Sequence, residues 1–238
     1  MTSVMLATYP DVFAGGAIIA GLPYRAATNV QQAFENMYQC PPRPARAWGD
    51  LVRRASPHKG PWPRVSVWHG GADTTVIPSN AVEIVKQWTD VHGLPDAPPF
   101  EEVVDGYPRQ VWSDSAGNDM IESYTIPHMA HGTPLASGAA DHECGAAGPF
   151  LLDVGISSSY HIAKFFGLAE RQAHNEPVQN ANATAARLSQ QRLPTTASPP
   201  LDGEILMPNS KERLQDTPFD VGAVITKALK AAGLMREG

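Results

Sequence analysis

The sequence has little positive charge, few cysteines and no long apolar run, and each shortage argues against a class of protein. Its 18 lysines and arginines are outnumbered by 24 aspartates and glutamates, which gives a net charge of −6 and a pI near 5.7. Nucleic acids and anionic membranes attract clustered Lys and Arg, so we expect neither as a partner. No apolar run approaches the roughly 18 residues of a membrane span, and the first ten residues lack the regions of a signal peptide.

Only two cysteines occur, Cys40 and Cys144, and neither lies in the C-x-x-C pair of a zinc ribbon or a thioredoxin motif. If the protein is exported, they are candidates for a disulfide that closes a loop of about a hundred residues, which would contribute up to about 4–5 kcal/mol. The alternative is two separate buried thiols. His128, His131, His142 and Cys144 are residue types that can bind a metal, but the sequence has no second group of ligands with matching spacing. We therefore expect no metal and no other cofactor.

What is present is the alternation of an α/β protein. Short apolar runs bounded by glycine or proline predict strands at residues 13–20 and 65–68, the first of them buried on both faces. This order of strands and helices predicts a parallel sheet flanked by helices. The helices are expected to end near residue 8, where a proline follows, and to span residues 29–37, 45–54 and 78–91.

The segment 101–127 interrupts this alternation. Residues 110–114 and 121–126 have the composition of strands, and the turn-forming residues 115–119 lie between them. This pattern predicts a β-hairpin.

The C-terminal third differs in composition from the rest of the chain. A serine-capped helix at residues 157–166 is expected to end a domain that spans residues 1–168. Residues 169–216 are polar, without a clear period, and predict a linker or disorder. Residues 217–235 predict an amphipathic helix that either docks on the domain or binds a partner. The sequence holds no internal repeat.

An aspartate and a histidine each follow the end of a predicted strand. Asp73 comes after strand 65–68 and the Gly70–Gly71 turn, and His131 follows the second hairpin strand, between two small residues. Ligands of open α/β sheets bind at the edge formed by the carboxyl ends of the strands. The order of an Asp followed by a His is also the second half of the Ser…Asp…His order of α/β-hydrolases. His131 is thus the candidate base for a serine nucleophile, and Asp73 the acid that orients it.

Each of these two residues also has a structural interpretation. An aspartate after a glycine turn is often a turn former or helix cap, and a histidine in a glycine-flanked loop is often structural. His128, which lies directly at the strand end, is the second candidate for the base. His69 is expected to pack or to bond the backbone. The serine that this order requires stands in a G-x-S-x-G elbow, and no such motif occurs in the sequence.

Four segments of the sequence stand out together: residues 11–17 (DVFAGGA), 69–80 (HGGADTTVIPSN), 129–134 (MAHGTP) and 153–163 (DVGISSSYHIA). In this order they resemble the esterase/poly(3-hydroxybutyrate) depolymerase family of α/β-hydrolases, and the resemblance covers residues 1–168. It implies an extracellular serine esterase in which Asp73 and His131 are catalytic. It also implies an ester substrate, either a polyhydroxyalkanoate or a short-chain, feruloyl or acetyl ester.

The same resemblance predicts what the sequence lacks. In the family, the nucleophile elbow lies shortly before the segment that matches residues 2–5, together with upstream strands and a loop that completes the oxyanion hole. Ser3 is expected inside a helix and lacks flanking glycines, so it is not the nucleophile. We therefore expect the C-terminal portion of an α/β-hydrolase fold, with the flank of strand 13–20 exposed. Such a chain is expected to be unstable or inactive alone.

Three functions remain open at this point. The first is a carboxylic-ester or polyester hydrolase with a Ser-Asp-His mechanism whose serine lies outside this sequence. The second is a catalytically inactive remnant that binds an ester or a glycan. The third is a structural protein whose C-terminal helix mediates an interaction.

Overall fold

The computed structural model describes residues 1–95, 97–98, 100–140 and 142–169, which form five helices and seven strands. Apart from residue 169, the predicted linker at 169–216 and the predicted helix at 217–235 lie outside these residues. No described helix is long and apolar enough to cross a membrane. In chain order the elements are α1 (Thr2–Thr8), β1 (Gly15–Ile19), α2 (Val30–Tyr38), α3 (Ala45–Arg53), β2 (Arg64–Gly70), α4 (Ser79–His92), β3 (Phe100–Val104), β4 (Tyr107–Ser113), β5 (Asp119–Ile126), β6 (Thr133–Leu135), β7 (Leu151–Asp153) and α5 (Ser158–Phe165).

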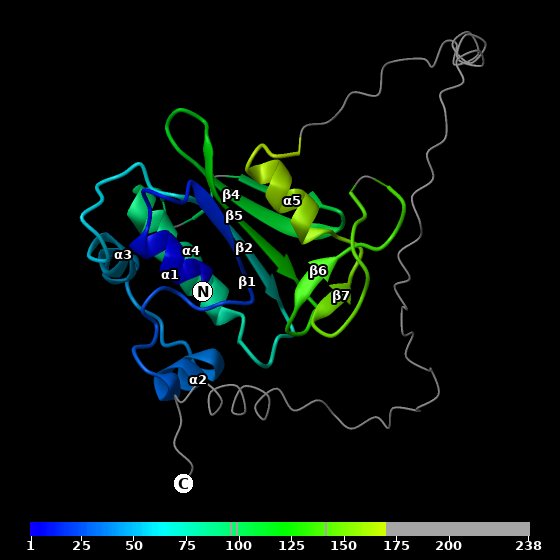
Figure 1. The fold of residues 1–238 in the computed structure, drawn as a ribbon, viewed down its shortest axis with the longest axis horizontal. Helices are drawn as coiled ribbons and strands as arrows, with labels where there is room; N and C mark the ends of the chain where they lie inside the picture. Colours follow the sequence, from blue (N-terminus) through cyan, green and yellow to red (C-terminus); the bar gives the residue numbers. More distant parts are fainter. Residues whose placement is uncertain (96, 99, 141, 170–238) are drawn as a thin grey trace, which may run out of the picture. The chain divides into compact units, whose positions relative to one another are not determined.

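The main sheet has five strands in the order β1-β2-β5-β4-β3 (Figure 1). Strands β1, β2 and β5 are parallel, whereas β4 and β3 run antiparallel to their neighbours. The expected parallel sheet is correct for these three strands, and the antiparallel β4 is the first strand of the predicted hairpin. Strand β3 was not predicted and extends the hairpin into a meander. Strands β6 and β7 form a small second sheet.

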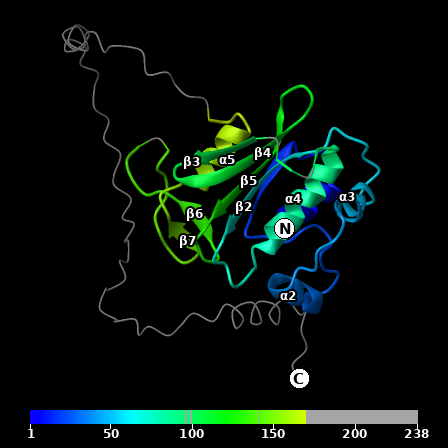
Figure 2. The same ribbon diagram turned by 180° about the vertical axis from the view of Figure 1, so that it is seen from behind.

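Helices cover both faces of the main sheet. On one face α1, α3 and α4 pack through Leu6, Val52 and Trp88 against Val65 and Ile121 of the strands. On the opposite face α5 lies in front of the sheet in Figure 1, whereas α4 lies in front in Figure 2. Most residues of β2 and β5 are buried. Successive side chains of a strand point to opposite faces of the sheet, so this burial requires that both faces are covered.

The predicted elements agree closely with the observed helices, with strands β1 and β2, and with the hairpin formed by β4 and β5. One feature of β1 is wrong. The strand was expected to be buried on both faces, but Ile18 is its one buried residue. In the described part of the chain β1 pairs with β2 alone. The strand thus lies at an edge of the sheet, as expected from the family resemblance.

Cys40 and Cys144, named as a disulfide pair on the condition of export, are both free in this structure. Cys40 is buried beside Ala26 and Trp48, and this burial raises the pKa of its thiol to about 11. Cys144 is exposed in the loop between β6 and β7, where its Sγ lies 3.0 Å from Ser157 Oγ. The two thiols thus lie in different parts of the structure, one buried and one exposed. The alternative of two separate thiols is correct, except that one of them is exposed.

Candidate active site

The loop that follows β2 fixes Asp73 through its own backbone. Asp73 is 3% exposed, and its Oδ1 accepts hydrogen bonds of 2.9 Å from both Thr75 N and Val76 N. A carboxylate that accepts two backbone N–H groups is held in one orientation. Its second oxygen, Oδ2, is left to face other parts of the chain.

Two backbone hydrogen bonds join this loop to the loop that carries His131. Gly71 N donates to Ile126 O at 2.7 Å, and Ala72 N donates to Met129 O at 3.1 Å. Side chains would prevent this contact, because a Cβ on Gly70 would lie 2.2 Å from Met129 O. The glycines are therefore required by the close approach of two loops. The sharp turn expected from the sequence is present, because Asp73 N donates to Gly70 O at 3.2 Å, but neither glycine has the positive φ that would demand glycine there.

The consequence of this packing is a direct contact between the two predicted site residues. His131 Nδ1 lies 2.8 Å from Asp73 Oδ2, and the His131 side chain is 27% exposed. A carboxylate only accepts, so Nδ1 carries the proton and donates it. Nε2 then holds the free lone pair, and no described residue forms a hydrogen bond with it. The pair has the geometry of an orienting acid and a base whose other nitrogen is open to a reactant.

A second histidine approaches the same carboxylate from inside the protein. His69 is 1% exposed, and its Nε2 lies 2.7 Å from Val76 O and 3.5 Å from Asp73 Oδ2. Both neighbours are acceptors, so Nε2 carries the proton. Burial lowers the pKa of His69 and keeps the ring neutral. The prediction that His69 bonds the backbone is confirmed, and the bond fixes the loop that orients Asp73.

The remaining sequence candidates lie apart from this pair. His128 is exposed, and no described hydrogen bond joins it to Asp73. Ser3 lies within α1, where its hydroxyl donates to Leu22 O at 2.7 Å. No group of three or more His, Cys, Asp or Glu among the described residues is arranged to hold a metal ion.

Phe150 is a neighbour of the site that the sequence did not indicate. Its ring centroid lies 6.0 Å from that of His131, in an edge-on arrangement, and the residue is 39% exposed. Its φ of +62° is rare for a bulky side chain. Phe150 O accepts from Thr133 N, which anchors this conformation. No sequence pattern marks such a residue, because its place depends on the pairing of β6 with β7.

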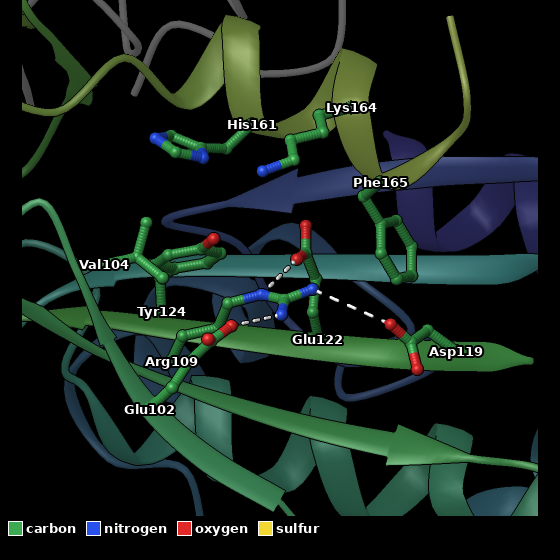
Figure 3. A pocket seen from close by; sticks show the side chains of 9 residues that line it. All are labelled: Glu102, Val104, Arg109, Asp119, Glu122, Tyr124, His161, Lys164 and Phe165. Atoms are coloured by element: carbon green, nitrogen blue, oxygen red, sulfur yellow. Dashed lines mark hydrogen bonds and ion pairs between the residues drawn. The ribbon is translucent and has the colours of Figure 1, made fainter. Parts of the chain in front are cut away.

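A polar pocket of about 250 Å³ lies elsewhere, between α5 and the sheet (Figure 3). Arg109 is at its centre, 2.9 Å from Glu122, 2.6 Å from Glu102 and 4.0 Å from Asp119. Burial raises the pKa of Glu122, which is 1% exposed. Arg109 thus bridges three carboxylates, and neither Asp73 nor His131 lines the pocket. The arrangement is that of a structural ion-pair network.

Comparisons with known proteins find esterases and a polyester depolymerase among the relatives. No protein-family model matches the sequence. Poly(3-hydroxyalkanoate) depolymerase C of Paucimonas lemoignei is 47% identical over 169 residues, which cover 71% of this chain and 41% of the relative. An acetylxylan esterase of Coprinopsis cinerea is 39% identical over 145 residues, covering 56% and 37%. The chain thus spans about two fifths of the length of these curated relatives.

Among solved structures, an acetyl xylan esterase from Aspergillus awamori has a similar fold, with a TM-score of 0.54. The match covers 71% of this chain and 55% of that chain at 22% identity. At this identity the likeness concerns the fold alone, a mixed sheet flanked by helices. It agrees with the α/β-hydrolase architecture that the sequence resemblance implied.

Proposed function

We propose that this chain, which belongs to the esterase/poly(3-hydroxybutyrate) depolymerase family, supplies the acid and the base of a carboxylic-ester hydrolase. The observation that carries the proposal is the 2.8 Å contact between His131 Nδ1 and Asp73 Oδ2, with Nε2 left open. The named relatives act on poly(3-hydroxyalkanoate) and acetylxylan, so the substrate is a polyhydroxyalkanoate or a short-chain acyl ester. By family likeness the reaction takes place outside the cell.

The roles of the two side chains follow from the direction of their hydrogen bond. His131 Nε2 removes the proton of a serine hydroxyl as the serine attacks the ester carbonyl, and later returns it to the departing alcohol. Asp73 holds the ring in the required tautomer and stabilises the imidazolium that forms. We assign no nucleophile within the 238 residues, since no G-x-S-x-G occurs. The proposal therefore concerns the acid and the base alone.

A hybrid enzyme tests the proposal. The segment that aligns with the Paucimonas lemoignei depolymerase replaces the corresponding 169 residues of that enzyme, and hydrolysis of p-nitrophenyl butyrate is measured. We expect an active hybrid whose kcat falls about 10⁴-fold or more with His131→Ala, because the base is lost. The matched control His128→Ala, at the exposed neighbouring histidine, is expected to stay within about threefold.

The absent elbow motif supports a second candidate, a non-catalytic protein that binds an ester or a glycan. The hybrid separates the two. A folded hybrid without activity would favour the binding protein. A hybrid that keeps its activity after His131→Ala would contradict the assignment of His131 as the base.

A further inference from the structure

The turn that precedes β7 holds a bulky residue in a conformation that favours glycine. Pro149 and Phe150 are its two central residues. Gly148 and Leu151 close the turn, because the N–H of each donates to the carbonyl oxygen of the other at 3.0 Å. Proline fixes φ near about −65°, and Phe150 has a φ of +62°. A turn with these two signs is of type II, which prefers Gly or Asn at the place of Phe150. The backbone of Phe150 is therefore strained.

Contacts with the loop of His131 hold this strained turn in place. Phe150 O accepts a hydrogen bond of 2.8 Å from Thr133 N. Thr133 begins β6, which lies beside β7 and pairs with it (Figure 1). A Cβ on Gly132 would lie 2.9 Å from Phe150 O, so the residue directly after His131 has to be a glycine. Two consecutive residues after the histidine thus fix the turn to its loop.

From this position the Phe150 side chain packs against the imidazole ring of His131. The ring centroids are 6.0 Å apart and the ring planes are 76° to each other, which is an edge-on aromatic pair. Asp73 is the one described residue that forms a hydrogen bond with the His131 side chain, and Phe150 is the one whose ring contacts it. The adjacent Ala130 and Gly132 offer at most a methyl group. Phe150 is therefore the second contact that restrains a side chain that is 27% exposed.

A single hydrogen bond does not fix a histidine ring. The torsion about the Cβ–Cγ bond of histidine is broad and roughly two-fold. A partly exposed ring is thus free to turn about this bond or to swing towards solvent, and either movement separates Nδ1 from Asp73. An aromatic ring packed against its side opposes both movements. Catalytic groups depend on such packing, because a displacement of about 1 Å lowers a rate about a hundredfold.

We propose that Phe150 is a positioning residue, which holds the His131 ring with Nδ1 towards Asp73 and Nε2 open. This role explains why a strained backbone is retained. Gly or Asn would suit the turn better, but would leave the histidine held by its hydrogen bond alone. The contribution to catalysis rests on the proposed function, whereas the restraint on the ring is a property of this chain by itself.

NMR of the full 238-residue chain tests the restraint without any catalytic step. The two carbon-bound ring protons of His131 are correlated with the ring nitrogens, whose shifts report which nitrogen carries the proton. The signals are identified by their loss in His131→Gln. At pH 9 we expect the parent chain to hold the tautomer with the proton on Nδ1. In Phe150→Asn we expect the nitrogen shifts to move towards the average of the two tautomers, because the ring rotates away from Asp73.

The choice of variants separates positioning from a contribution to folding. Asparagine tolerates a positive φ, so Phe150→Asn is expected to leave the urea midpoint unchanged or higher. A ring that only stabilised the fold would instead lower the midpoint and leave the tautomer unchanged. Phe150→Tyr keeps the aromatic ring and is expected to keep the parent tautomer.

Phe100→Asn is the matched control. Phe100 is 52% exposed on β3 and is level, through Val111 of β4, with Glu122 of β5. Glu122 lies four residues before the end of β5, and the loop of His131 follows that end. We expect the control to leave the His131 signals as they are in the parent chain.

The hybrid depolymerase measures the consequence for catalysis. Phe150→Asn is expected to lower kcat about ten- to hundredfold with KM within about threefold, and Phe150→Tyr to restore kcat to within about threefold of the parent hybrid. The proposal is overturned if His131 keeps its tautomer in Phe150→Asn, or if Phe150→Tyr loses it as well. An inactive hybrid would count against the proposed function and would leave the NMR result on Phe150 standing.

Discussion

At the scale of single residues, the candidate site depends on what two glycines leave out. Gly70 and Gly71 look like turn residues in the sequence, but both have ordinary φ values. What they allow is contact between backbones, since Met129 O and Pro127 O occupy the places that their Cβ atoms would take. The distance between Asp73 and His131 is therefore set by the absence of side chains beside them.

Substitution of Gly70 by alanine tests this directly. Its Cβ would lie 2.2 Å from a backbone oxygen, so the two loops must separate. We expect the free energy of unfolding to fall by about 2–3 kcal/mol or more in urea titrations. Gly148→Ala is the matched control, because a Cβ there meets nothing within 4 Å. Equal stability of the two variants would show that the loop contact is not tight.

At the scale of helices and strands, α3 and α4 are joined by a side chain that substitutes for backbone pairing. Gln87 of α4 is fully buried, and its Oε1 accepts from Tyr24 N at 2.8 Å. Its Nε2 donates to Tyr24 O and to Trp48 O, each at 3.1 Å. One side chain thus forms hydrogen bonds with three backbone groups of other segments, two on Tyr24 and one on Trp48.

We expect Gln87→Leu to lower the free energy of unfolding by about 3 kcal/mol, because it removes three hydrogen bonds from the interior at about 1 kcal/mol each. Chemical denaturation followed by circular dichroism measures the change. Gln31→Leu, at an exposed glutamine of α2, is expected to change stability by at most about 0.5 kcal/mol. A loss below 1 kcal/mol for Gln87→Leu would mean that water replaces the amide.

The sequence predicted elements better than their pairing. The hairpin of β4 and β5 follows from the turn residues 115–119, and the helices follow from their caps and apolar spacing. The parallel pairing of β5 with β2 did not follow, because it joins residues more than fifty positions apart. Strand β3 was missed, since its residues are mostly exposed and its apolar residues Phe100, Val103 and Val104 do not alternate with polar ones. Three-residue strands such as β6 and β7 are too short for any period to appear.

At the scale of the whole molecule, the site was predictable in its members and not in its contacts. Asp73 and His131 stand out because each follows a strand, in a known order. The structure brings them to hydrogen-bond distance, as the sequence interpretation required. The nearby ring of Phe150 comes from a distant loop, and the role of His69 in bonding Val76 depends on the fold of residues 70–76.

Stability is expected to depend on pH through three buried histidines. Burial is the largest cause that lowers the pKa values of His69, His92 and His161, so the folded protein keeps them neutral. In the unfolded chain they take up protons near the ordinary value of about 6.5. The unfolded state then binds more protons, and the free energy of unfolding falls as the pH drops below about 6.5.

Urea titrations at pH 7.5 and 5.5 measure this effect. The raised pKa of Glu122 acts in the opposite direction above its ordinary value, so the comparison is made between variants. His92→Gln is expected to reduce the loss of stability between the two pH values, whereas His128→Gln, at an exposed position, leaves it unchanged. An identical loss in His92→Gln and the parent would rule out a contribution from His92.

The account rests on the hydrogen bond from His131 to Asp73, and one substitution tests that bond most directly. Asp73→Asn in the hybrid depolymerase keeps the size of the side chain, and its Oδ1 position still accepts from Thr75 N and Val76 N. An amide N–H then faces His131 Nδ1 and selects the wrong tautomer. We predict that kcat/KM for p-nitrophenyl butyrate falls about 10³–10⁴-fold, with an unchanged urea midpoint. A fall of less than tenfold in a folded variant would contradict the catalytic assignment of the pair.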